Sequence, residues 1–98
     1  MSINPKIFKA YDIRGLYPEE IDEKVAYAIA RATAQFMFGG STSKHRMVVA
    51  MDNRGSSLAL KEAVMRGLAE EGVQIIDCGV TTTQMFYFAV NHLKADGG

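Results

Sequence analysis

Apolar residues recur along the chain in two kinds of spacing, and polar segments separate them. From residue 21 to residue 38 the apolar positions fall every three or four residues, as on one face of a helix. Residues 47–51 form a continuous apolar run, which is typical of a strand covered on both faces. The whole pattern predicts helices over 21–38, 60–68 and 85–93 and strands over 7–11, 47–51 and 73–77.

Residue types at the element ends and on the helix faces extend this prediction. Asp22 and Gly39 are residue types that begin and end helices, and Gly72 follows the second helix. We expect the apolar helix faces and the aromatic side chains in the core, where they would not serve as stacking platforms for nucleic acid. The first and third helices then bury Val25, Ala28, Ile29, Ala32, Phe36, Phe38, Met85, Phe86, Tyr87, Phe88, Ala89, Val90 and Leu93.

Strands that alternate with helices indicate a fold class. Such βαβ units form α/β domains in which helices cover both faces of the sheet. With 98 residues the chain is long enough for one core and too short for two. We therefore predict a single domain over residues 1–98, a three-layer α/β/α domain with a mainly parallel or mixed sheet.

Charge and composition narrow the possible partners and the compartment. Eleven Lys and Arg balance eleven Asp and Glu, so no global field favours nucleic acid or an anionic membrane. The N-terminus has no signal-peptide pattern, and no apolar run approaches the ~18 residues that cross a bilayer. The single cysteine, Cys78, suits a reducing compartment and a buried thiol. We expect a cytoplasmic protein with no nucleic-acid or membrane partner.

Three polar segments follow the predicted strands and hold the candidate chemistry. They are residues 12–15, 52–57 and 81–83. In α/β sheets ligands bind beyond the carboxyl ends of strands, where guanidinium, hydroxyl and backbone N–H groups hold anions. Arg14 follows a strand directly and precedes a glycine, so an anion contact and a structural role are equally open for it.

Structural roles are the stronger expectation at the other polar positions. Ser56 or Ser57 fits the N-cap of the second helix, and Thr82 or Thr83 fits that of the third. Asp52 and Arg54 are close enough in sequence to form an ion pair within their turn. His45 and His92 lack ligand-spaced neighbours, so we expect no zinc site, and neither G-x-G-x-x-G nor a Walker sequence is present.

Three segments together resemble the α-D-phosphohexomutases, in particular the phosphomannomutase/phosphoglucomutase branch. Residues 8–15 resemble the family's opening F-x-x-Y-D-I-R-G, and residues 50–57 are similar to G-x-D-x-R-x-S-S with Ala50 in place of glycine. Residues 77–88 resemble the D-x-G-x-x-P-T-P segment, with Thr82 and Gln84 where the prolines usually stand. The resemblance identifies the chain as domain I, the N-terminal domain, of a four-domain phosphohexomutase.

The family's chemistry implies roles for a few residues of this chain. Such enzymes interconvert hexose 6-phosphates and hexose 1-phosphates through an active-site phosphoserine and a bisphosphorylated sugar. By resemblance Tyr11 and Arg14 border the cleft near the phosphoserine, and Arg54 and Ser57 are weaker candidates. The phosphoserine loop, T-A-S-H-N-P, and the magnesium loop, D-G-D-x-D-R, do not occur in the sequence.

The ending at residues 96–98 resembles the segment that precedes the phosphoserine strand. We therefore expect a domain fragment with the last strand missing, no catalytic residue, no metal site and no activity of its own. Magnesium and hexose phosphates would belong to the parent enzyme. An unpaired sheet edge would favour self-association of the fragment.

The alternative is a stand-alone module that binds an anion or a partner through Arg14 and Arg54 without catalysis. The gene downstream of Gly98 separates the two hypotheses. A strand followed by T-A-S-H-N-P supports the mutase, whereas a stop codon supports the module.

Overall fold

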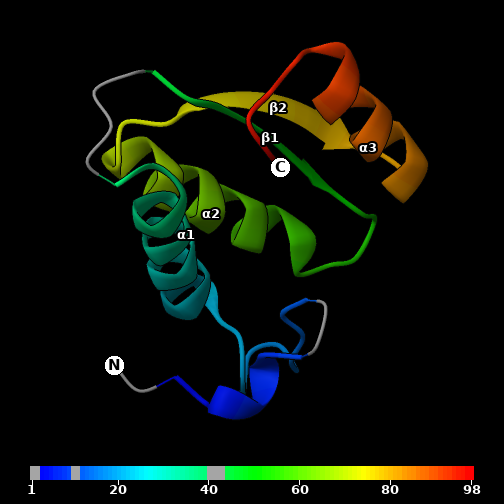
Figure 1. Ribbon diagram of the computed structural model, residues 1–98. Coiled ribbons are helices and arrows are strands. Elements are labelled where there is room, and N and C mark those ends of the chain that lie inside the picture. Colours follow the sequence, from blue (N-terminus) through cyan, green and yellow to red (C-terminus); the bar gives the residue numbers. More distant parts are fainter. Residues whose placement is uncertain (1–2, 10–11, 40–43) are drawn as a thin grey trace.

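The three predicted helices and two of the three predicted strands form in the part of the chain that the structure describes. This structure is a computed structural model that describes residues 3–9, 12–39 and 44–98. A short 3₁₀ helix, η1, precedes the larger elements (Figure 1). The element order is η1 (Pro5–Ile7), α1 (Glu23–Phe38), β1 (Arg46–Met51), α2 (Ser57–Glu70), β2 (Gln74–Val80) and α3 (Thr83–His92).

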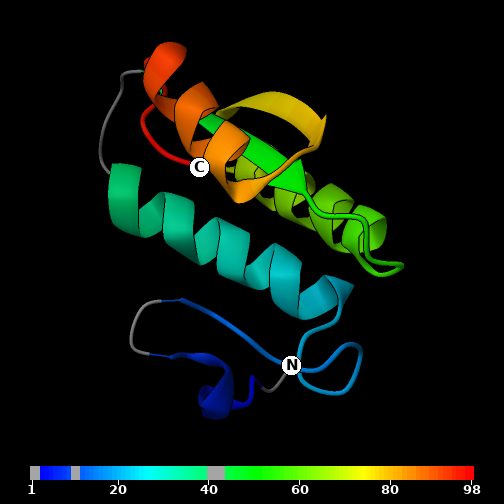
Figure 2. The same ribbon diagram turned by 90° about the vertical axis from the view of Figure 1, so that its right-hand side faces the viewer.

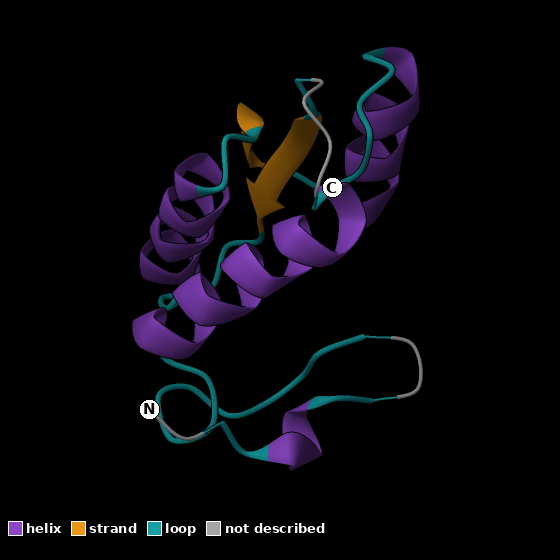
Figure 3. Cartoon of the chain, turned by 60° about the vertical axis from the view of Figure 1, so that its left-hand side comes forward, coloured by secondary structure: helices purple, strands orange, loops and turns teal. Residues whose placement is uncertain are grey.

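The elements stack in three layers, as the alternation of strands and helices predicts. β1 and β2 pair in parallel, with Arg46 opposite Gln74 and Val49 opposite Asp77. Helices α1 and α2 lie on one side of the two strands and α3 lies on the other (Figures 1 and 2). Figure 3 shows the same strand pair enclosed between the helices. The α/β/α fold class is therefore confirmed.

The predicted first strand over residues 7–11 is wrong in its described part. The Asn4 side chain accepts a hydrogen bond from the Lys6 N–H at 3.0 Å, and Pro5 occupies the first helical position, so the segment begins as η1. Phe8 then forms an isolated antiparallel bridge with Ile13. Phe8 therefore pairs with Ile13 and not with β1, and residues 10–11 lie outside the described residues.

The buried face of α1 differs from the predicted one. The buried residues are Val25, Ala26, Ala30 and Ala34, whereas Ala32 is exposed and Phe36 is 92% exposed. Gly67 of α2 explains the shift, because a Cβ there would lie 2.9 Å from the Ala30 Cβ. The two helices approach closely through small side chains, and this contact selects the alanine face.

Helix α3 covers the sheet less completely than predicted. None of its residues is buried, and among the described strands its main contact is with β1. Phe86, Ala89 and Val90 are half-buried, whereas Phe88 is 58% exposed. The prediction of a core position is wrong for the exposed side chains on α3 and at its end, which are Met85, Tyr87, Phe88 and Leu93.

The helix-end predictions are largely confirmed. The Asp22 carboxylate accepts a hydrogen bond from the Val25 N–H at 2.8 Å and caps α1, and Gly39 follows its last turn. The Thr82 hydroxyl accepts from the Met85 N–H at 3.1 Å and caps α3. Gly72 follows α2 with φ of 81°, a conformation that favours glycine.

β1 lies between β2 and the residues at the end of the sequence. The Asp96 N–H donates to the Arg46 carbonyl at 2.8 Å, and the Val48 N–H donates to the Gly97 carbonyl at 3.0 Å. Gly97 also forms a parallel bridge with Met47. The position of β1 between two neighbours explains why Val48 is fully buried. Self-association of the fragment through an unpaired sheet edge stays a prediction.

Two further expectations concern the thiol and the bilayer. The Cys78 thiol is half-buried rather than buried, because β2 has a neighbouring strand on one side only among the described residues. No helix in the described residues is long and apolar enough to cross a membrane.

Candidate functional site

Two arginines from separate parts of the sequence line one cavity. Arg14 comes from the loop before α1, and Arg54 comes from the loop between β1 and α2. The cavity has a volume of about 680 Å³. Although the described residues before Arg14 form no strand, the fold still brings the two arginines to one site.

Each of these arginines contacts an aspartate two residues earlier in the sequence. Arg14 Nε lies 2.9 Å from Asp12 Oδ2, and Arg54 Nε lies 3.0 Å from Asp52 Oδ2, so the predicted ion pair of Asp52 and Arg54 is confirmed. Both guanidinium side chains stay open to solvent, 76% and 82% exposed. Because the contact is made through Nε, the Nη atoms remain to donate to an anion.

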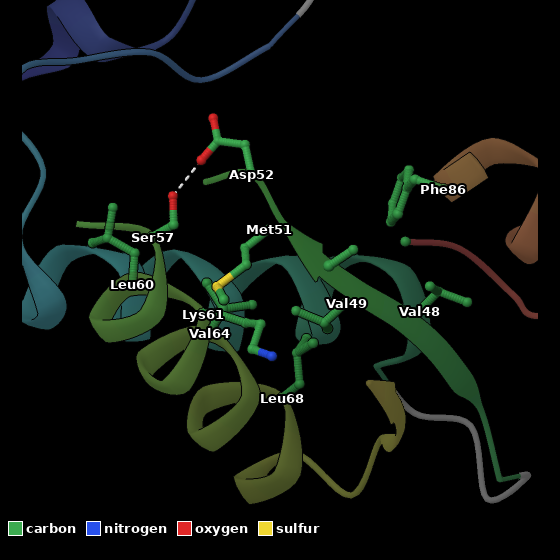
Figure 4. Close-up of a pocket in the computed structure, with 12 residues that line it drawn as sticks. Val48, Val49, Met51, Asp52, Ser57, Leu60, Lys61, Val64, Leu68 and Phe86 are labelled. Carbon is green, nitrogen blue, oxygen red and sulfur yellow. Dashed lines mark hydrogen bonds between the residues drawn. The ribbon is translucent and has the colours of Figure 1, made fainter. Parts of the chain in front are cut away.

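Asp52 accepts hydrogen bonds from two further groups. The Ser57 hydroxyl donates to Asp52 Oδ1 (Figure 4), and the Arg54 N–H donates to the same oxygen at 3.3 Å. The Ser57 hydroxyl and then the Arg54 N–H lower the pKa of the Asp52 carboxyl below its ordinary value. Asp52 is therefore held as a carboxylate that fixes one side of Arg54.

The expected serine cap of α2 is not formed by a side chain. Ser56 occupies the N-cap position, but its hydroxyl makes no capping hydrogen bond. Its backbone is already in the helical region, with φ of −82° and ψ of −13°. That conformation differs from the extended backbone of an N-cap, and Ser57 lies one residue into the helix with its hydroxyl on Asp52.

Ser57 lines a neighbouring cavity and not the one that holds the arginines. This second cavity has a volume of about 360 Å³ and lies between α2, β1 and Phe86 of α3. Figure 4 shows Asp52 and Ser57 at one end of it, with Phe86 across β1 from α2. Asp52 lines both cavities, so Ser57 reaches the arginine site only through Asp52.

The remaining predicted positions are Tyr11 and residues 81–83. Tyr11 lies outside the described residues. Residues 81–83 line a third cavity of about 280 Å³ beside Asp52, near the carboxyl ends of β1 and β2. Among residues 3–9, 12–39 and 44–98, no three His, Cys, Asp or Glu side chains are grouped so that they could hold a metal ion.

The sequence prediction missed two charged residues of the arginine cavity, Lys9 and Glu20. One signal was available for the site as a whole, because the tetrapeptide D-x-R-G occurs twice, at residues 12–15 and 52–55. Nothing comparable in the sequence marked Glu20. Its carboxylate accepts from the Leu16 N–H at 2.9 Å, a contact that depends on the tight turn before α1.

The fold and the site together define an α/β/α domain with a cavity lined by two arginines. Comparison with known proteins is consistent with this class. Residues 5–98 match the family described as phosphoglucomutase/phosphomannomutase, alpha/beta/alpha domain I. The chain therefore belongs to the phosphoglucomutase/phosphomannomutase family, as the motifs indicate.

Relatives in several bacteria support the same assignment. A phosphomannomutase of Vibrio cholerae is 45% identical over 93% of this chain, and one of Klebsiella pneumoniae is 44% identical over 93%. A crystal structure of a phosphoglucomutase/phosphomannomutase family protein from Burkholderia thailandensis superimposes with a TM-score of 0.83 and 39% identity, covering 91% of this chain.

The chain corresponds to a small part of most of these proteins. It spans 20% of the Vibrio cholerae relative and 19% of the Burkholderia thailandensis chain. It spans 55% of the Klebsiella pneumoniae relative. The similarity therefore covers one domain and does not by itself assign an activity to this chain.

Proposed function

We propose that this chain is the first domain of a phosphohexomutase and supplies one side of its phosphosugar cleft. In this proposal the full-length product interconverts hexose 6-phosphate and hexose 1-phosphate through a phosphoserine. Residues 1–98 contain no T-A-S-H-N-P segment, so the phosphoserine would come from another part of that product. The domain alone would then bind without turning over substrate.

The observation that carries the proposal is the meeting of Arg14 and Arg54 at one cavity. Phosphoryl transfer depends on positioning and on neutralising the charge of the phosphoryl oxygens. Two guanidinium groups whose Nε atoms are held by aspartates have their Nη atoms available for such oxygens. Membership in a family whose relatives are phosphomannomutases makes a phosphosugar the natural ligand.

The remaining chemistry would lie outside this chain. Magnesium is expected for the full-length product by resemblance to the family. The described residues offer no grouped ligands for it, so no step here passes through a metal held by this domain. Tyr11 and Ser57 stay candidates for the cleft, Ser57 through its contact with Asp52.

The test is Arg14→Ala in the full-length gene product, assayed for conversion of mannose 1-phosphate and glucose 1-phosphate. We expect kcat/KM to fall by roughly tenfold or more, because a group that stabilises phosphoryl charge is lost. Arg66→Ala is the matched control, since Arg66 lies on α2 over the Tyr27 ring and away from the cavity. Equal activities of the two variants would remove Arg14 from the site.

The same assay addresses the stand-alone module. A full-length product that binds hexose phosphates through Arg14 and Arg54 but converts neither sugar would be a binding protein. The cleft geometry would then be correct and the proposed reaction wrong.

A further inference from the structure

Lys9 lines the same cavity as Arg14 and Arg54. Its backbone N–H donates to the Asp12 carbonyl at 2.8 Å, and the Arg14 N–H donates to the Ile7 carbonyl at 2.7 Å. These two bonds tie residues 7 and 9 to residues 14 and 12. They hold the backbone of Lys9 close to that of Arg14, and both residues line the same cavity.

The carboxylates of the site are already engaged by other groups. Asp12 contacts Arg14 and Asp52 contacts Arg54. Glu20 accepts from the Leu16 N–H at 2.9 Å and from the Asn4 amide at 3.5 Å. Among the described residues Lys9 forms no ion pair, so it brings a positive charge to the cavity that no carboxylate contacts.

The difference between Lys9 and the two paired arginines affects how an anion would bind in the cavity. A carboxylate already offsets part of the charge of each arginine, whereas the Lys9 ammonium is a compact charge with three donors. An anion that meets Lys9 gains a charge contact without disturbing either aspartate pair. The chain as a whole has eleven positive and eleven negative side chains, so the effect is local to the cavity.

We propose that Lys9 is a third anion-binding residue of this cavity and supplies the positive charge that attracts a phosphate dianion. The inference rests on the proposed function and deepens it, because it assigns a binding role to a residue that the motifs leave variable. Lys9 would bind the phosphate group of the ligand, and recognition of the sugar hydroxyls would not depend on Lys9.

The experiment is a titration of residues 1–98 with inorganic phosphate, followed by amide and arginine side-chain NMR shifts. Lys9→Gln should raise the Kd for phosphate roughly two- to fivefold, the range of one exposed charge pair. Lys9→Arg should restore binding. Lys24→Gln, an equal charge change at an exposed position on α1 outside the cavity, should leave the Kd unchanged.

Ionic strength provides a second measurement. The affinity of the original protein should fall more steeply with added NaCl than that of Lys9→Gln, because one fewer charge takes part in the variant. A purely structural role of Lys9 would leave this slope unchanged.

The outcomes separate the two proposals. Phosphate shifts at Arg14 and Arg54 with equal Kd values for Lys9→Gln and Lys24→Gln would overturn the role of Lys9 and leave the cleft standing. No phosphate shift at either arginine in the original protein would overturn both.

Discussion

The turns at residues 12–15 and 52–55 share the sequence Asp-x-Arg-Gly, but different parts of the fold hold them. The first is attached to the N-terminal loop, where the Arg14 N–H donates to the Ile7 carbonyl at 2.7 Å. The second leads directly into α2, and Ser57 in the first turn of that helix donates to Asp52. The same local motif can therefore be fixed either by packing beneath it or by a helix that follows it.

Gly15 and Gly55 show that the first turn is packed more tightly than the second. A Cβ on Gly15 would lie 2.9 Å from Ile7 Cγ2 and 3.0 Å from Ile21 Cγ1. A Cβ on Gly55 would meet nothing within 4 Å. Gly15 is thus needed for the close approach of the first turn to Ile7, whereas the glycine of the second turn has open space around it.

The largest expected effect is at Ile7, the fully buried side chain beneath the first turn. Ile7→Ala should lower the free energy of unfolding by about 2–5 kcal/mol, because it removes buried methylene groups and leaves a cavity. Urea denaturation measures the loss. Leu58 near the second turn is 53% exposed, so Leu58→Ala should change stability by about 0.5 kcal/mol or less. Similar losses at both positions would show that the first turn is packed no more tightly than the second.

A smaller effect is expected at the paired glycines. Gly15→Ala should cost about 1–3 kcal/mol, since the added methyl group meets side chains of a packed region. Gly55→Ala should be close to neutral, which makes it the matched control. Thermal unfolding of both variants is the measurement, and a stable Gly15→Ala protein would show that the first turn can move away from Ile7.

The smallest effect concerns the hydrogen bond that is particular to the second turn. The Ser57 hydroxyl lowers the pKa of Asp52, so Ser57→Ala should raise that pKa toward the ordinary value of an aspartate. A carboxyl with a lowered pKa stabilises the fold above its unfolded pKa, and this contribution is lost as the pH falls through the folded pKa. In Ser57→Ala this contribution should be smaller, and Asp52 should take up its proton at higher pH.

Carboxyl NMR shifts measured from pH 6 to pH 2 follow the titration of Asp52 directly. Ser56→Ala is the control, because the Ser56 hydroxyl makes no capping hydrogen bond. Identical titration curves for the two serine variants would contradict the role assigned to Ser57.

Much of the fold could be predicted from residue spacing. The long apolar periodicity of α1, the continuous run of β1 and the caps at Asp22 and Thr82 are local features. Secondary structure follows such features when tertiary contacts agree with them. The prediction failed where tertiary contacts did not agree with them. The apolar segment near Phe8 forms η1 and an isolated bridge from Phe8 to Ile13, and Phe36 stays exposed because α1 packs through its alanines.

Some features of the candidate site could be predicted from the sequence, and others could not. The motifs marked Arg14, Arg54 and Ser57, and the pair of Asp52 with Arg54 followed from their two-residue separation. The separation of Ser57 from the arginine cavity could not be predicted. It depends on the direction in which the hydroxyl leaves the first turn of α2, where it meets Asp52.

The family, the order of most elements and the two Asp-x-Arg-Gly turns could be predicted from the sequence, because these depend on residues that are neighbours along the chain. The three-dimensional structure was needed to show that the two turns share one cavity and that Lys9 and Glu20 line it as well. That arrangement requires the N-terminal loop to fold back beside the end of β1. Such a contact joins residues about forty positions apart, and no local spacing encodes it.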